Sequence, residues 1–64
     1  MTRGKQYIYN GERIEYVGIK RLAVGTGLID HYLFSRAKGG QVMFTINEWE
    51  RLKLQEINNE TGIN

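Results

Sequence analysis

The chain contains no cysteine, and at a length of 64 residues this leaves few ways to stabilise a fold. A domain of roughly 60 residues buries only about 60% of the surface that its unfolded chain exposes. Small domains commonly compensate with disulfides, a bound metal ion or association with other chains. The sequence has no thiol and only one histidine, His31, so we expect neither a disulfide nor a metal site nor another cofactor. We therefore predict a single domain over residues 1–64 that forms a homodimer or a larger homo-oligomer.

The composition is that of a folded protein rather than a disordered one, with 41% hydrophobic and 25% charged residues. No apolar run approaches the roughly 20 residues that cross a bilayer. No hydrophobic segment of the signal-peptide type follows the basic residues of the N-terminus. We expect a cytoplasmic protein that does not associate with membranes.

Glycine and asparagine mark the expected turns, because the chain has no proline. The pair Asn10-Gly11 lies between alternating apolar residues, which predicts a two-residue type I′ hairpin between strands over residues 5–9 and 13–24. The apolar alternation changes phase at Gly18, which predicts a β-bulge. Residues 25–27 predict a second turn before a strand over residues 28–36. Residues 37–40 predict a third turn, before a strand over residues 41–44.

A helix is expected after the last of these strands. Thr45 and Glu48 have the spacing of a capping box, and Phe44 and Trp49 that of a hydrophobic staple, so the helix should cover residues 46–57. The predicted fold class is α+β and mainly β, with about four strands in a small antiparallel sheet followed by a C-terminal helix. The bend at Gly18 would let the sheet curl towards an SH3-like barrel. Residues 1–4 and 58–64 are expected to be flexible tails.

No combination of residues predicts catalysis. Asp30 and His31 are neighbours on a strand and should point to opposite faces of the sheet, so they cannot form an acid–base pair. Ser35 lies on the same predicted face as His31, but no residue is placed to orient the imidazole or to form an oxyanion hole. We expect no catalytic residue and no enzymatic activity.

The strand over residues 28–36 has apolar residues on both faces, and one face therefore needs a covering partner. The favoured function is a non-enzymatic protein-interaction module. It would be an oligomeric accessory, adaptor or inhibitor protein of the kind common in bacteria and phages. The predicted interface residues are Leu28, Ile29, His31 and Leu33.

Two other functions also fit the sequence. Tyrosines and basic residues on a curved sheet are typical of single-stranded nucleic-acid binding, with bases stacked on the rings and phosphates neutralised by the cations. The residues for this role are Tyr7, Tyr9, Tyr32, Lys20, Arg21, Arg36 and Lys38. A lesser alternative is sequestration of a nucleotide or small molecule at a subunit interface near His31, with phosphate contacts from Gly25, Thr26 and Gly27.

Overall fold

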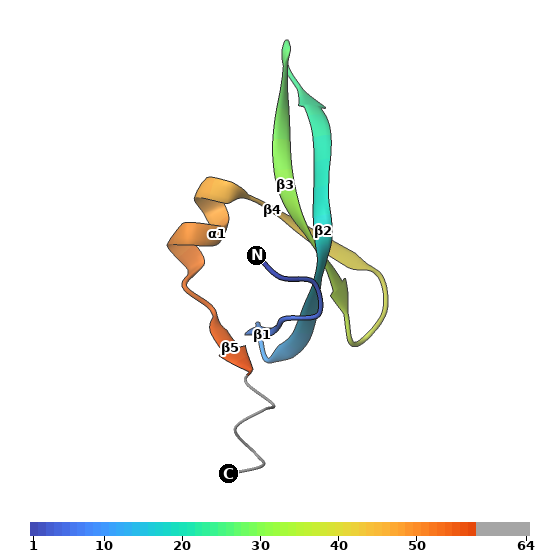
Figure 1. Cartoon of the computed structure of the whole chain (residues 1–64), viewed down its shortest axis with the longest axis vertical. Coiled ribbons are helices and arrows are strands. Elements are labelled where there is room, and N and C mark those ends of the chain that lie inside the picture. Colours follow the sequence, from blue (N-terminus) through green and yellow to red (C-terminus); the bar gives the residue numbers. More distant parts are fainter. Residues whose placement is uncertain (58–64) are drawn as a thin grey trace.

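The computed structural model describes residues 1–57, which form five strands and one helix (Figure 1). In chain order these are β1 (Gln6–Tyr9), β2 (Glu12–Val24), β3 (Gly27–Arg36), β4 (Gln41–Thr45), α1 (Ile46–Leu52) and β5 (Gln55–Ile57). The strands pair antiparallel in one sheet of order β4-β3-β2-β1-β5. The predicted fold class, mainly β with one helix, is confirmed. Within the described residues the sheet is open, with β4 and β5 at its edges, so the curl does not close into a barrel.

Both two-residue hairpin turns depend on positive backbone angles. Asn10 and Gly11 have φ values of 53° and 76°, and Tyr9 pairs with Glu12 across them, which confirms the type I′ turn. Val24 pairs with Gly27 across Gly25 and Thr26. Here only the first central residue, Gly25, has a positive φ of 62°, which is the pattern of a type II′ turn.

The predicted bulge is present in β2. Tyr16 pairs with Phe34, whereas the next pair joins Gly18 to Leu33, so Val17 is an extra residue on β2. Gly18 has a φ of 152°, which residues with a side chain rarely adopt. On the other side of β2 the N-terminal segment reaches Tyr16. The Gly4 N–H donates to the Tyr16 carbonyl (3.0 Å), and the Tyr16 N–H donates to the Lys5 carbonyl (2.9 Å).

The core lies between one face of the sheet and α1. Its buried hydrophobic residues are Ile14, Tyr16, Phe34 and Phe44. Trp49 of α1 packs against this cluster. The capping box predicted at the start of α1 is confirmed: the Glu48 N–H donates to Thr45 Oγ1 (3.1 Å) and the Thr45 N–H donates to Glu48 Oε1 (2.9 Å). The Phe44 and Trp49 rings lie 5.9 Å apart, as the predicted staple requires.

The predicted extent of the helix is wrong. α1 ends at Leu52, because Lys53 adopts a left-handed conformation (φ 49°, ψ 52°). Leu54 then packs against the core, and β5 pairs with β1 from Ile57 opposite Gln6 to Gln55 opposite Ile8. This pairing satisfies the backbone groups at an edge of β1 that a longer helix would have left open. The expected tail over residues 58–64 lies outside the described residues.

Candidate functional site

The β2–β3 hairpin extends well beyond the rest of the sheet (Figure 1). β1 pairs with β2 only as far as Glu15, and the N-terminal segment bonds β2 at Tyr16. β4 pairs with β3 only from His31 onwards. Within the described part of the chain, residues 19–24 and 27–30 therefore pair only with each other. We call residues 19–30 the arm.

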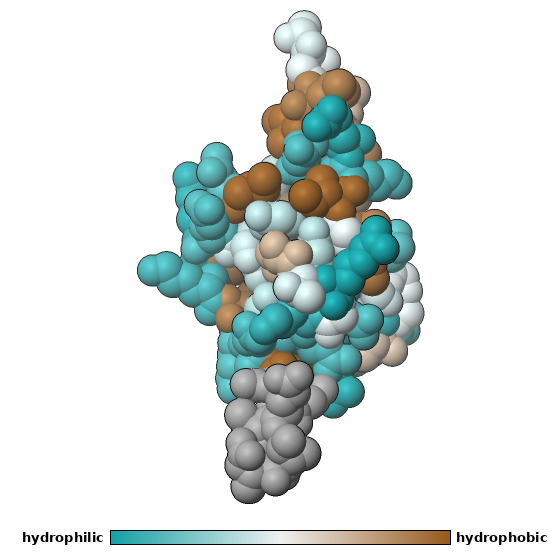
Figure 2. All heavy atoms as spheres, viewed as in Figure 1, coloured by the Kyte–Doolittle hydropathy of each residue, from teal (hydrophilic) through white to brown (hydrophobic). Residues whose placement is uncertain are grey.

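The arm exposes most of its large apolar side chains. The exposed fractions are 66% for Leu28, 57% for Ile19, 49% for Val24 and 39% for Ile29. Figure 2 shows hydrophobic atoms along the arm below its pale tip and again where the arm meets the body of the protein. Scattered exposed apolar residues are ordinary, but several on one projecting hairpin mark an interaction surface.

The two faces of the arm differ in chemistry. Cross-strand partners share a face, so Leu22 and Ile29 lie on one face together with Val24, which is two residues from Leu22. Arg21 and Asp30 lie on the opposite face with Ala23 and Leu28. Arg21 Nε donates to Asp30 Oδ1 (2.8 Å), and this hydrogen bond holds the pKa of Asp30 below its ordinary value.

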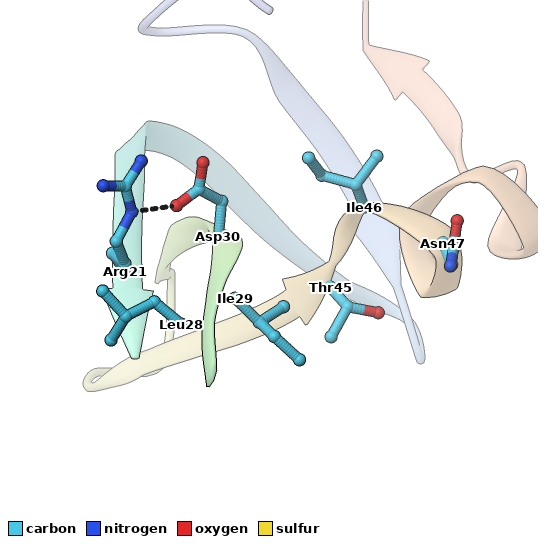
Figure 3. Close-up of a pocket in the computed structure, with 7 residues that line it drawn as sticks. All are labelled: Arg21, Leu28, Ile29, Asp30, Thr45, Ile46 and Asn47. Atoms are coloured by element: carbon cyan, nitrogen blue, oxygen red, sulfur yellow. Dashed lines mark hydrogen bonds and ion pairs between the residues drawn. The ribbon is translucent and has the colours of Figure 1, made fainter. Parts of the chain in front are cut away.

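A groove of about 530 Å³ runs along the β3 edge of the arm. It lies where β4 leaves the sheet at Thr45 and the chain turns into α1 (Figure 3). Its lining residues are Arg21, Leu28, Ile29, Asp30, Thr45, Ile46 and Asn47. Three apolar side chains from two separate segments thus border the groove, and the Arg21–Asp30 ion pair lies at one side of it.

Backbone groups of β3 also face this groove. The Arg36 N–H donates to the Gly40 carbonyl (3.0 Å), so the backbone of Arg36 faces the β4 side of β3. The direction of backbone N–H and C=O groups alternates along a strand, and the register of β3 is continuous. Counting back by twos, the backbone groups of Asp30 and Leu28 face the same side. Asp30 lies directly beside the last pair with β4, which joins His31 to Thr45, and Leu28 lies beyond it.

The four predicted interface residues do not form one surface. Leu28 and Ile29 line the groove. His31 lies at the base of the arm, opposite Thr45, with Nδ1 3.0 Å from the Ile29 carbonyl oxygen. Leu33 is half-buried and pairs with Gly18 and Met43, away from the residues that line the groove.

The tyrosines predicted to stack on bases pack against the core instead of standing free. Tyr7 contacts Trp49 edge to face, with ring centroids 4.8 Å apart, and Tyr9 contacts Phe44 in the same way at 5.0 Å. Tyr32 contacts Tyr16 at 5.8 Å. Burial is the main cause of the raised pKa of Tyr7, followed by the nearby Glu56 carboxylate.

The basic residues predicted to bind phosphates are divided between two regions. Lys20 and Arg21 are consecutive on β2 and lie on opposite faces of the arm. Arg36 ends β3 and Lys38 follows it, and both bind Glu12. Arg36 Nη2 donates to Glu12 Oε1 (3.1 Å), and the Lys38 N–H donates to Glu12 Oε2 (3.0 Å). These hydrogen bonds lower the pKa of the buried Glu12 carboxyl, and the bond from Lys38 has the larger effect.

The glycines of the lesser alternative form the tip of the arm. Gly25 and Gly27 are exposed, and a Cβ placed on either would meet no atom within 4 Å. The positive φ of Gly25 is what the type II′ turn requires. The turn accounts for this glycine, and the described residues surrounding the tip do not enclose a site.

The groove residues Thr45, Ile46 and Asn47 were missed by the sequence interpretation. The sequence pattern of these residues correctly predicts the start of a helix. It gives no signal that this start lies beside Ile29. Among residues 1–57, no three His, Asp or Glu side chains gather to hold a metal ion. No helix of this described part is long and apolar enough to cross a membrane.

Comparisons with protein-family models, curated proteins and solved structures found no match for this chain.

Proposed function

We propose that this protein is a protein-interaction module that binds an extended segment of another protein along the β3 edge of the arm. The observation that carries the proposal is the exposed pair Leu28 and Ile29 beside uncovered backbone groups of β3. In this role the chain would act as an accessory, adaptor or inhibitor protein, and its partner would be recognised by backbone pairing and by apolar side chains.

The binding mode is addition of a strand to an open sheet edge. In this mode main-chain hydrogen bonds give affinity, and pockets for alternate side chains give specificity. A partner strand would continue the line of β4 past Thr45 and bond the outward-facing backbone groups of Leu28. Its side chains would contact Leu28, Ile29 and Ile46, which line the groove.

A pull-down from a lysate of the source cells, with the tagged chain as bait, tests this proposal. We expect the wild-type chain to retain a protein that Leu28→Glu loses, because a carboxylate in the groove would have to be desolvated on binding. Leu52→Glu is the matched control, since Leu52 is also an exposed leucine, at 37%, but lies at the end of α1. Equal recovery by the two variants contradicts the proposal.

Leu28→Pro tests the strand-addition mode itself. The Leu28 N–H faces the groove and not β2, so proline removes a donor for the partner while the hairpin keeps its own bonds. We expect Leu28→Pro to lose the partner and Leu28→Ala to retain part of the binding. Full retention by Leu28→Pro would show that the partner does not add as a strand.

Nucleic-acid binding is the second function to be measured, and the geometry supports it less. Its tyrosines contact the core, and its cations lie in two regions. It predicts an affinity for single-stranded oligonucleotides that falls steeply with salt. Such an affinity, lost in Lys20→Ala and kept in Leu28→Glu, would favour this function over the one proposed here.

A further inference from the structure

We infer that the β2 edge of the arm, opposite the groove, pairs with the same edge of a second copy of this chain in an antiparallel dimer centred on Leu22. This inference uses a different edge from the proposed partner site and stands independently of it. The paired region is residues 19–24, the part of β2 beyond the N-terminal segment.

The arm lacks the support that a hairpin ordinarily needs. An isolated two-stranded hairpin is at best marginally stable in water, and independent stability takes roughly three or more strands with a hydrophobic face. The β2 edge of the arm contains no proline and no bulge after Gly18, two of the devices that prevent edge pairing, although it contains the charged residues Lys20 and Arg21, which limit how two such edges can pair. Pairing of two such edges would join both arms into one wider sheet.

The backbone direction limits the registers in which two β2 edges can pair. Gly27, Ile29 and His31 alternate with the outward-facing Leu28 and Asp30, so their backbone groups face β2. Their partners Val24, Leu22 and Lys20 therefore face β3. It follows that the N–H and C=O groups of Ile19, Arg21 and Ala23 face outward, and a second copy must bond these residues.

Charge then selects among the two-fold symmetric registers. A dimer centred on Lys20 places Lys20 opposite Lys20 of the second copy, and one centred on Arg21 opposes two arginines. Like charges directly opposite each other are destabilising. Centring on Leu22 avoids both arrangements, because Arg21 then pairs with Ala23 and Lys20 with Val24. Centring on Ala23 also avoids them, but it shortens the overlap.

The register centred on Leu22 also places compatible side chains of the two copies next to each other. On one face it brings Leu22, Val24 and Ile29 of both copies into one continuous apolar strip, since these residues already share a face within each arm. The aliphatic stem of each Lys20 lies over Val24 of the other copy while its ammonium group stays in water. On the other face, the small Ala23 leaves room for Arg21.

Cysteine scanning tests the register, because the chain has no native cysteine. Leu22 and its copy form a non-hydrogen-bonded pair with Cα atoms about 4.5 Å apart, which is within the range that a disulfide can bridge. We expect Leu22→Cys to form a disulfide-linked dimer under mild oxidation. The matched controls Lys20→Cys and Leu28→Cys lie off the two-fold axis and should stay monomeric on a denaturing gel. Equal cross-linking of all three variants overturns the inference.

Sedimentation of the untagged full chain measures the association without a cross-link. We expect the mass of two chains for the wild type and of one chain for Ala23→Pro, whose proline removes an outward N–H without removing a bond to β3. Leu28→Pro should remain a dimer while losing any partner, so failure of this inference is distinguishable from failure of the proposed function. A wild-type monomer, or an open-ended polymer of head-to-tail pairs, overturns the inference. If Ala23→Pro unfolds, as Trp49 emission would show, the Leu22→Cys result decides alone.

Discussion

The indole of Trp49 stacks on the phenyl ring of Phe34, with ring centroids 4.8 Å apart and an interplanar angle of 27°. Phe34 is fully buried on β3, and Trp49 comes from α1, so this contact joins the helix to the sheet. The base of the arm and the start of α1 border the groove. The geometry of the groove therefore depends on the Phe34–Trp49 contact being in place.

Phe34→Leu should reduce the free energy of unfolding by about 1–2 kcal/mol, from lost apolar burial and lost aromatic contacts. Denaturant titration followed by the emission of Trp49, the only tryptophan, measures this change. Leu52→Ala, at an exposed position, is the control and should cost less. An equal loss in the two variants would mean that the stacked contact contributes nothing of its own.

The capping box gives a second stability prediction. Thr45→Ala removes the hydroxyl that accepts from the Glu48 N–H and should cost about 1 kcal/mol, whereas Thr45→Ser should restore most of it. Thermal unfolding followed by circular dichroism compares the two variants. Identical midpoints for alanine and serine would show that the hydroxyl does not stabilise α1.

Gly18→Ala should destabilise the protein by about 1 kcal/mol or more, because alanine is strained at a φ of 152°. A clash is not the cause, since the nearest atom to an added Cβ is Arg3 Nη2 at 3.9 Å. Gly27→Ala is the matched control: its φ is not positive and its Cβ position is open, so alanine should be neutral or slightly stabilising there. The same loss at both positions would contradict the role assigned to the bulge.

Stability should fall in acid because of two carboxylates. Hydrogen bonds from Lys38 and Arg36 lower the pKa of Glu12 from its ordinary value of 4.5. A hydrogen bond from Arg21 lowers the pKa of Asp30 from its ordinary value of 3.8. The unfolded chain therefore binds protons more readily than the folded one as pH falls below about 5. The stabilisation is complete above the unfolded pKa and is lost as pH falls through the folded pKa.

Unfolding midpoints measured between neutral pH and strong acid test whether stability falls as the pH falls. Glu12→Gln should flatten the acid loss, because the neutral amide no longer titrates and keeps only part of the hydrogen bonding. Glu50→Gln, at an exposed position on α1, is the control and should keep the wild-type slope. An unchanged slope in Glu12→Gln would assign the acid sensitivity to other groups.

The features that the sequence predicts correctly all have local signals. Asn10-Gly11 identifies a turn, the phase change at Gly18 identifies a bulge, and Thr45 with Glu48 identifies a helix start. Each depends on backbone preferences within a few residues. The strand over residues 28–36 was predicted with both faces apolar, but only pairing with β4 shows which residues stay uncovered.

The features that the sequence does not predict depend on contacts between distant segments. The apolar spacing of Ile46, Trp49, Leu52 and Ile57 fits a helix, yet Lys53 turns left-handed and Ile57 pairs with Gln6 instead. No short-range pattern at Lys53 identifies that turn. The groove likewise combines Leu28 and Ile29 with Ile46, which lies far along the chain, so its existence depends on where β4 ends.

The most direct test of the arm as the partner site is photo-cross-linking from a benzophenone side chain placed at residue 28. The protein would be expressed in the cells that encode it, with the same group at residue 52 as the control. We expect one discrete cross-linked partner from residue 28 and none from residue 52. Cross-linking of the same partner from both positions, or only from residue 52, would contradict the assignment of the arm as the binding surface.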